Sequence, residues 1–364
     1  MTIICGSPMM VSGLLSDRVG RRTNDGIRKI PKTSPKIKAR TSRKQRDETV
    51  ITKGPGTIIL RYNNGQFHQI PADPRHSIRW VAFRRDGRSG VAVGNKGLVL
   101  NFNGVTFEQQ NSPSQENLRC ASYNTAGEAI IVGNHGTILY SKDGELTPIN
   151  EDTKDNLRRV SWSPDGSAAI LVGNNGTALS WRGGKIKEVA GAINNLRSVT
   201  WHPDGHEALI SGNYFGTSMV PCPTLYSYEL ASERMRPLKT TDKIDILAIE
   251  WRPDGEYALA VGYEVVWHEP RLLRWTNNEL EEIRFPESGL YPTTIAWAPQ
   301  DDLALIGTGS PHPPGRDEGR VLEYREGSIR RLYSGTYRIT CIAWNPREDY
   351  AVIVGQKAAR TFTT

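Results

Sequence analysis

The chain has 364 residues, of which 37% are hydrophobic and 23% charged, and it contains 35 Gly, 22 Pro and 9 Trp. No stretch approaches the roughly 18–20 apolar residues of a membrane-spanning helix, so we expect no membrane span. The net charge of +7 is uneven, because residues 1–46 contain twelve Lys/Arg and two acidic residues, whereas the remainder has 34 basic and 37 acidic residues and is close to neutral.

Residues 1–50 form a basic N-terminal segment. Apart from a mildly apolar stretch, Ile3–Leu15, it consists largely of Lys, Arg, Ser, Thr, Pro and Gly. Such a composition cannot bury enough apolar surface to offset the entropy of ordering, which predicts a disordered tail. The alternative is that residues 18–46 bind nucleic acid or the ribosome weakly through their charge.

The first segment with strand character is Gly56–Gly65, which reads GTIILRYNNG. It matches Gly136–Gly144, GTILYSKDG, with one extra residue at the turn. Both runs end in Asn-Gly or Asp-Gly, which are typical of a tight hairpin turn. The start of this region therefore predicts two strands of a kind that recurs in the middle of the chain.

A repeat with a period near 40 residues follows. Asn156–Gly166, NLRRVSWSPDG, recurs as Asn195–Gly205, NLRSVTWHPDG, and as Asp245–Gly255, DILAIEWRPDG. Weaker copies bring the number of anchor aromatic residues to seven: Phe83, Tyr123, Trp162, Trp201, Trp251, Trp297 and Trp344. We interpret them as core residues between repeats, since four short strands per repeat of 40–45 residues are typical of β-propellers.

Each repeat predicts the same four strands. The first carries the anchor aromatic, as in Leu196–Trp201, and a Pro-Asp-Gly turn follows it. The second is apolar and ends in Gly, as in Ala129–Gly133 and Ala169–Gly173, and the third is exemplified by Thr137–Ser141. An Asp143-Gly144 turn leads to the fourth strand.

The chain ends shortly after a second strand, Ala351–Gly355, so its last repeat lacks two strands. We expect residues 56–70 to supply them and to complete the repeat that begins at 337–355. Such closure removes the open edges that favour aggregation. The prediction is an all-β domain over residues 51–364, a seven-bladed β-propeller of four-stranded antiparallel blades.

The Trp-x-Pro-Asp-Gly turn followed by an apolar strand resembles the WD40 repeats over about residues 54–356, although no repeat has the Gly-His or terminal Trp-Asp of that group. The runs Val132–Leu139 and Val172–Leu179 are similar to Ycf48-type and BNR-type propellers. Ser141–Gly144 lacks the spacing of the sialidase Asp-box. The resemblance implies a fold and does not name a function.

An arginine stands four residues before the anchor aromatic in four consecutive repeats: Arg79, Arg119, Arg158 and Arg197. The other three repeats have Leu247, Thr293 and Thr340. We expect this position to lie near the axis on the face that carries the longer loops. Four guanidinium groups there would bind an acidic peptide or phosphate. The alternative is structural, with each stem packed between blades and each head bonded to a loop carbonyl.

Three repeats have longer connections between their second and third strands, near Tyr214–Thr224, Tyr263–Pro270 and Ser310–Gly319. Adjacent long loops on one face of a rigid scaffold suggest a raised recognition surface, although long loops are also tolerated without function. Candidate partner-binding residues in these loops are Trp267, His268, His312 and Arg316. A metal site between the two histidines is a weaker alternative, and we assign no metal, cofactor or catalytic residue.

Among the four cysteines, Cys120 and Cys341 occupy equivalent small-residue positions and are expected to be buried thiols, which favours a cytoplasmic location. Glu250 is the only acidic residue in the cores of the seven first strands, so an enzyme is disfavoured. We therefore expect a monomeric scaffold that binds a protein or acidic peptide on its loop-rich face. The alternatives are a hydrolase or lyase with an axial site, and nucleic-acid association through the tail.

Overall fold

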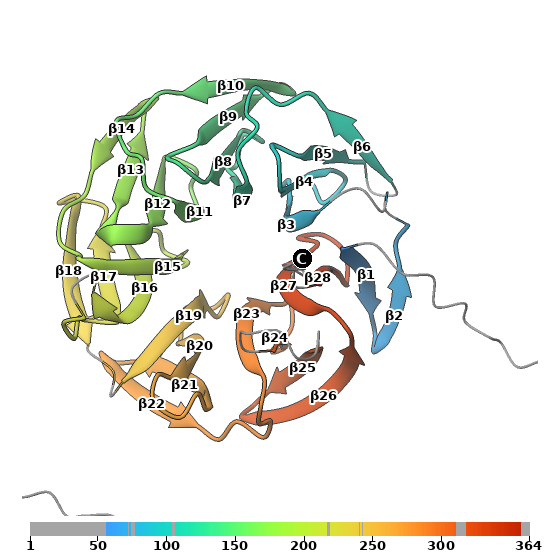
Figure 1. Ribbon diagram of the computed structural model, residues 1–364, viewed down its shortest axis with the longest axis vertical. Helices are drawn as coiled ribbons and strands as arrows, with labels where there is room; N and C mark the ends of the chain where they lie inside the picture. Colours follow the sequence, from blue (N-terminus) through green and yellow to red (C-terminus); the bar gives the residue numbers. More distant parts are fainter. Residues whose placement is uncertain are drawn as a thin grey trace, which may run out of the picture. The chain divides into compact units, whose positions relative to one another are not determined.

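The first strand of every repeat lies next to a common axis, and the later strands follow outward (Figure 1). The computed structural model describes residues 56–357 except 72, 74–76, 104–105, 217–218, 240, 242 and 311–317. The described strands form seven four-stranded antiparallel sheets, which confirms the predicted seven-bladed β-propeller. The predicted basic tail, residues 1–50, lies outside the described residues.

The blades follow the chain from the first anchor aromatic onward. Blade 1 consists of β3 (Ile78–Phe83), β4 (Gly90–Gly94), β5 (Val99–Phe102) and β6 (Phe107–Gln110). Blade 2 consists of β7 (Leu118–Tyr123), β8 (Ala129–Gly133), β9 (Ile138–Lys142) and β10 (Glu145–Ile149). Blade 3 consists of β11 (Leu157–Trp162), β12 (Ala168–Gly173), β13 (Ala178–Arg182) and β14 (Lys185–Glu188), and the 3-10 helix η1 (Asn174–Gly176) joins β12 to β13.

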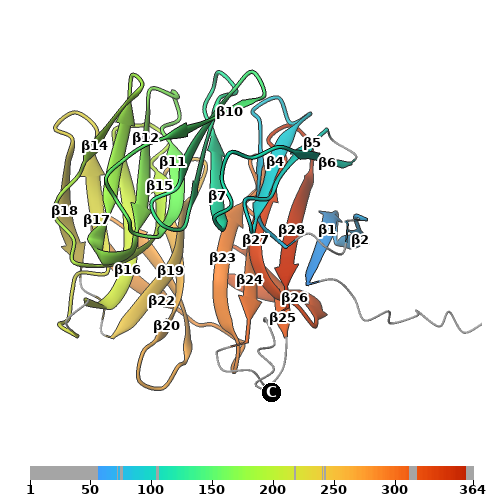
Figure 2. The same ribbon diagram turned by 45° about the horizontal axis from the view of Figure 1, so that its top comes forward.

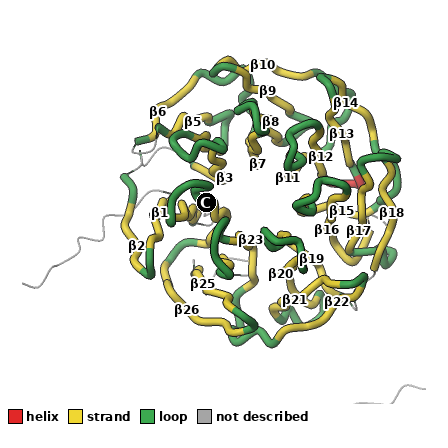
Figure 3. Tube along the Cα trace, turned by 180° about the vertical axis from the view of Figure 1, so that it is seen from behind, coloured by secondary structure: helices red, strands yellow, loops and turns green. Residues whose placement is uncertain are grey.

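The remaining blades have longer strands. Blade 4 consists of β15 (Asn194–Trp201), β16 (Glu207–Gly216), β17 (Leu225–Glu229) and β18 (Arg234–Lys239). Blade 5 consists of β19 (Ile244–Trp251), β20 (Ala258–Glu264), β21 (Pro270–Thr276) and β22 (Glu279–Ile283). Blade 6 consists of β23 (Tyr291–Trp297), β24 (Ala304–Gly309), β25 (Gly319–Arg325) and β26 (Ser328–Gly335), and blade 7 begins with β27 (Arg338–Trp344) and β28 (Tyr350–Gln356). Seen from behind, strands and their short connections make up nearly all of the ring (Figure 3).

Blade 7 is completed by the start of the described chain. β1 (Thr57–Asn63) pairs antiparallel with β28, from Thr57 opposite Gln356 to Asn63 opposite Tyr350, and β2 (Gln66–Gln69) pairs with β1. The sheet order is β2-β1-β28-β27. The predicted closure by residues 56–70 is thus confirmed, and it joins the two ends of the described chain in one sheet.

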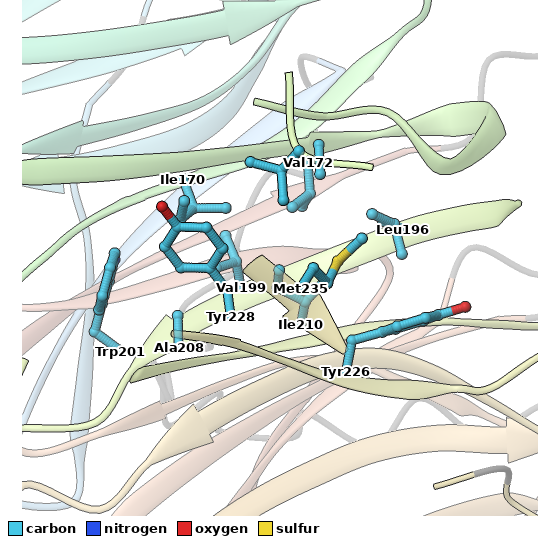
Figure 4. Close-up of a cluster of buried hydrophobic side chains, with 12 residues drawn as sticks. Ile170, Val172, Leu196, Val199, Trp201, Ala208, Ile210, Tyr226, Tyr228 and Met235 are labelled. Carbon is cyan, nitrogen blue, oxygen red and sulfur yellow. The ribbon is translucent and has the colours of Figure 1, made fainter. Parts of the chain in front are cut away.

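The core consists of apolar side chains packed between neighbouring blades. Figure 4 shows the cluster between blades 3 and 4, in which Ile170 and Val172 face Leu196, Val199 and Trp201. Because both faces of each blade are covered by neighbours, the second strands read as continuous apolar runs, and every residue of β12 is buried. Burial of this kind supplies most of the stability of a fold.

Three of the anchor tryptophans also tie neighbouring blades together by hydrogen bonds. The indole N–H of Trp162 donates to the carbonyl of Ser122 in the preceding blade at 3.1 Å, and Trp201 donates to Ser161 at 3.0 Å. Trp344 of blade 7 makes the equivalent bond to the carbonyl of Ala296 in blade 6 at 3.1 Å. These bonds confirm that the anchors belong to the core between blades.

The connections on one face of the propeller, here called the loop-rich face, join second to third strands and fourth strands to the next blade. The two kinds of connection are adjacent, since the Gly136 N–H donates to the Asp155 carbonyl at 2.8 Å. On this face β16 and β20 extend further than predicted, so Tyr214 and Tyr263 lie in strands and Pro270 begins β21. The long connections of blades 4 and 5 are therefore partly extensions of the sheets, and β20 with its loop projects at the lower edge of Figure 2.

Cys120 and Cys341 are buried, as predicted, and their thiols contact carbonyls of the following blade. The described residues include no helix long and apolar enough to span a bilayer.

Candidate anion-binding site on the axis

Each first strand contains a β-bulge at the position of the arginine series. The pairing of β3 with β4 passes from Ile78 to Trp80 and leaves Arg79 out of register, and the same shift omits Arg119 and Arg158. The residues omitted in the other blades are Arg197, Leu247, Thr293 and Thr340. A bulge leaves one residue outside the alternation of the strand and redirects its side chain. The sequence position predicted to lie near the axis is thus a shared backbone feature of all seven blades.

Each of the four arginines is held by an asparagine of its own blade. Nε donates to a side-chain amide oxygen at 2.5–2.9 Å in the pairs Arg79–Asn95, Arg119–Asn134, Arg158–Asn174 and Arg197–Asn213. In each pair the asparagine directly follows a glycine at or near the end of the second strand. The other three blades have Tyr263, Thr308 and Gln356 there. Sequence reasoning anticipated a loop carbonyl as the structural partner and missed this pairing, although arginine and asparagine occur in the same four blades.

The guanidinium groups converge. Burial and, to a smaller extent, the charges of Arg158, Arg79 and Arg197 together lower the pKa of Arg119 to about 10. The pKa of Arg158 is also lowered to about 10, by burial and then by Arg197 and Arg79. Since Arg79 and Arg158 lie two blades apart, their mutual repulsion requires both side chains to approach the axis. With pKa values this high, these groups remain charged at neutral pH.

Two further arginines join this cluster. The Arg159 guanidinium lies 4.0 Å from the centroid of the Trp80 ring, in a cation–π contact that spans from blade 3 to blade 1. Arg338 begins β27, and burial lowers its pKa, as do the charges of Arg79 and Arg197. Sequence reasoning missed both residues, because neither stands at the bulge position. We call Arg79, Arg119, Arg158, Arg197, Arg159 and Arg338 the axial arginines.

None of the axial arginines forms an ion pair with a described residue, in contrast to the arginines on the outer strands and turns. The Asn-bound arginines use only Nε, so their Nη groups have no protein acceptor in the described part of the chain. Arginine is rarely buried without a partner. The axial cluster therefore presents several unpaired donors of positive charge to solvent or to a ligand.

The two acidic residues near the cluster, Asp245 and Glu250, offset only part of its positive charge. The buried Asp245 carboxylate accepts hydrogen bonds from Asn213 Nδ2 at 2.8 Å, the Tyr214 N–H at 2.7 Å and the Tyr263 hydroxyl at 3.1 Å. Burial raises the pKa of Glu250 to about 7, against a smaller opposing effect of Arg159. The charge of Asp245 raises the pKa of Arg197 against the larger effect of burial, and Glu250 is only partly charged at neutral pH.

An aromatic group borders the arginines on blades 5 and 6. The rings of Tyr263 and Tyr291 are stacked with centroids 4.4 Å apart, and His268 lies 5.9 Å from each. Because Tyr263 also contacts Asp245, a continuous set of contacts runs from Arg197 through its asparagine to these rings. The predicted residue His268 is thereby placed beside the axial site.

Exposed apolar side chains gather on the same face. The large hydrophobic residues that stand exposed in the described chain are Ile193, Met219, Val220, Val266 and Trp267. All of them lie in loop-rich-face connections of blades 3 to 5, and Trp267 is 79% exposed. Their position agrees with the raised surface predicted for blades 4 and 5. His312 and Arg316 lie outside the described residues, so the contribution of blade 6 and the proximity of His268 to His312 remain predictions.

The opposite face has a cavity of about 730 Å³ between blades 6 and 7. Four of its charged groups pair with one another: Arg325 forms a bidentate pair with Asp301 at 2.7–2.8 Å, and Arg330 pairs with Glu323 at 2.8 Å. Paired surface charges attract a ligand less than unpaired ones do, so the axial site is the stronger candidate for binding an anion.

No protein-family model and no curated protein sequence matches the chain. Solved structures do match it at low identity. Hydrazine synthase of Kuenenia stuttgartiensis is 12% identical with a TM-score of 0.61, over 78% of this chain and 96% of that one. The β-propeller domain of Myceliophteria thermophila Cps50 (Swd1) is 11% identical with a TM-score of 0.59, over 78% and 98% respectively. YCF48 bound to a D1 peptide is 16% identical with a TM-score of 0.57, over 77% and 89%.

The fold is that of WD40-like and Ycf48-like propellers. At such identities the likeness extends to the fold alone. The matched propellers include an enzyme and a peptide-bound protein, so the axial residues must decide between functions.

Proposed function

We propose that this propeller is a non-enzymatic binding protein that docks an acidic segment of a protein partner on its loop-rich face. The observation that carries the proposal is the set of axial arginines without ion pairs in the described chain. The exposed apolar side chains beside them add the non-polar contact area that a protein interface needs. A matched propeller, YCF48, was solved with a bound peptide, which agrees with the proposal.

The enzyme alternative depends on Glu250, whose pKa of about 7 suits a general acid or base. A hydrolytic site usually needs a second free carboxylate or a nucleophile beside it. Asp245 does not provide one, because hydrogen bonds occupy it. We therefore favour binding over catalysis. A cytoplasmic, monomeric protein remains part of the proposal, as buried free thiols suit a reducing compartment.

Peptide binding measured by fluorescence anisotropy tests the proposal. The probe is a labelled peptide rich in Asp and Glu that also contains Leu and Phe, and the reference is a peptide of neutral composition. Arg119→Ala combined with Arg158→Ala should weaken binding of the acidic peptide about tenfold or more, because two charge-assisted contacts are lost. Trp267→Ser should weaken binding of both the acidic peptide and the neutral reference peptide, in which Asn and Gln replace Asp and Glu.

Arg88→Ala combined with Arg236→Ala is the matched control, since it removes two exposed positive charges away from the axis. Equal losses in the axial and control variants would reduce the effect to net charge and contradict the proposal. The tail alternative has a separate test: RNA or heparin binding should disappear when residues 1–46 are deleted.

A further inference from the structure

Only some of the N–H groups of the axial arginines are available to a ligand. In four of them Nε is committed to an asparagine oxygen, so the side-on pair of Nε and Nη is not available for a bidentate bond. The free end of each guanidinium, with both Nη atoms, is what remains for a ligand. These ends come from four consecutive blades, and Arg338 adds a fifth from blade 7.

Blade 3 supplies a second donor outside the bulge position. Arg159 follows the bulge residue Arg158 along β11 and reaches over Trp80. Its charge lowers the pKa of both Arg119 and Arg158, so it lies close to them. The cluster is therefore a three-dimensional set of donors around the axis.

A single carboxylate uses only part of this arrangement. It is planar, carries one charge and has two oxygens, which two arginines satisfy. A phosphoryl group has three terminal oxygens that point in different directions and a charge of about −1.5 to −2 at neutral pH. Six guanidinium groups beside at most two carboxylates, Asp245 and Glu250, leave an excess of positive charge that a single monoanion would not offset.

We propose that the axial site recognises a phosphoryl group, carried by a phosphorylated side chain of the partner or by a free oligophosphate. If the phosphoryl group belongs to a side chain of the partner, the inference rests on the proposed docking of a partner segment. Arginine rather than lysine at every position agrees with it, because the planar guanidinium forms paired bonds to phosphate oxygens. The asparagines hold each guanidinium in place, so less rotamer entropy is lost when the ligand binds.

Isothermal titration calorimetry on the full chain distinguishes the sources. The probes are a phosphoserine peptide of acidic and apolar composition, the same peptide with Glu in place of phosphoserine, the same peptide with Ser, and inorganic triphosphate. The phosphopeptide should bind about tenfold or more tightly than the Glu peptide. Arg119→Lys with Arg158→Lys, which keeps the charge, should abolish most of that preference, whereas Arg88→Lys with Arg236→Lys should not.

Equal affinity for the phosphopeptide and the Glu peptide would overturn the inference while leaving the proposed docking intact. Tight triphosphate binding without phosphopeptide binding would support the phosphoryl site and contradict docking of a partner segment. Binding of neither probe would overturn both. Thermal unfolding of each lysine variant shows whether it is folded, and a melting temperature that triphosphate raises in the wild type but not in the lysine variant provides a second readout of the site.

Discussion

Each bulge arginine depends on one amide group for its orientation. Asn134 and Asn174 accept the Nε–H of Arg119 and Arg158, and the rest of each guanidinium has no described partner. Without the amide, the guanidinium keeps its charge but gains rotamer freedom, which a ligand must then restrict. The asparagines are thus positioning residues.

Asn134→Ala with Asn174→Ala should therefore weaken binding of the acidic or phosphorylated peptide about three- to tenfold, through lost pre-organisation. The salt dependence of binding should keep the wild-type slope, because the number of cationic groups is unchanged. The exposed pair Gln69→Ala with Gln109→Ala is the control. A shallower salt slope in the asparagine variant would show that the arginines had left the site, and would argue against a purely orienting role.

Glu250 makes the stability of the propeller depend on pH. Burial raises its pKa from 4.5 to about 7 in the folded protein, whereas an unfolded chain has the ordinary value. Between these two values the folded state holds a proton that the unfolded state has lost. Stability should therefore decrease as the pH rises through this window, and the loss should be complete above about pH 7.

Glu250→Gln removes this titration. At pH 8 we expect the variant to be about 1–2 kcal/mol more stable than the wild type, after allowance for water that screens the charge, and at pH 4 the two should be nearly equal. Urea unfolding at a series of pH values measures the difference. Glu279→Gln, in an exposed part of β22, should show no such dependence. A constant difference across the pH range would contradict a raised pKa at Glu250.

At the scale of elements, the sequence predicted the strands better than their irregularities. The second strand Ala129–Gly133 was predicted with its observed bounds, since an apolar run that ends in Gly is a local signal. The bulges were not predicted, because a bulge is defined by how two strands pair and not by either strand alone. For the same reason the repeat predicted where the arginines lie, but it gave no sign that a bulge turns their side chains toward the axis.

A glycine near the end of the second strand explains the close approach beside the bulge. A Cβ on Gly94 would lie 2.1 Å from the Ser77 carbonyl oxygen, and one on Gly262 would lie 1.9 Å from that of Asp245. In the four blades that carry a bulge arginine, the same glycine precedes the asparagine that holds it. Packing of the two inner strands and orientation of the site therefore depend on one short sequence, Gly-Asn.

Gly94→Ala should destabilise the fold by about 1–3 kcal/mol, because the backbone carbonyl cannot move away without shifting β3. Gly56→Ala is the control, since a Cβ there meets nothing within 4 Å, and it should change stability by less than about 0.5 kcal/mol. Guanidinium chloride unfolding measures both. Equal midpoints for the two variants would show that the inner strands separate readily at the bulge.

At the scale of the whole molecule, the sequence repeat was enough to predict the number of blades and the closure of the propeller. The residues that make up the axial site became evident only from the closed ring in the structure. Six arginines scattered between residues 79 and 338 become neighbours because seven first strands surround one axis. Arg159 and Arg338 could not be assigned from the repeat, since neither occurs at an equivalent position in other blades. Convergence of this kind depends on closure, so the site and the closing blade should be lost together.

Two truncations test this dependence. Removing residues 1–50 leaves all 28 strands of the described part of the chain, and the melting temperature should stay within about 2 °C of the wild type if residues 51–364 form the domain. Removing residues 1–70 deletes β1 and β2, and with them the buried side chains Ile59, Leu60 and Tyr62. β28 would then present an apolar edge along Tyr350–Gln356, which favours association with other chains.

We expect the longer truncation to aggregate or to elute as oligomers in size-exclusion chromatography, and to lose triphosphate and peptide binding even in its soluble fraction. The reason is that β27 carries Arg338 and lies beside β3 with Arg79, so an open ring no longer fixes the distance between the first and last blades. Adding a peptide of residues 51–70 in excess should restore part of the binding, because it supplies the two missing strands. A monomeric, fully binding product without that peptide would show that six blades and half of the seventh suffice, and that the arginines converge without closure.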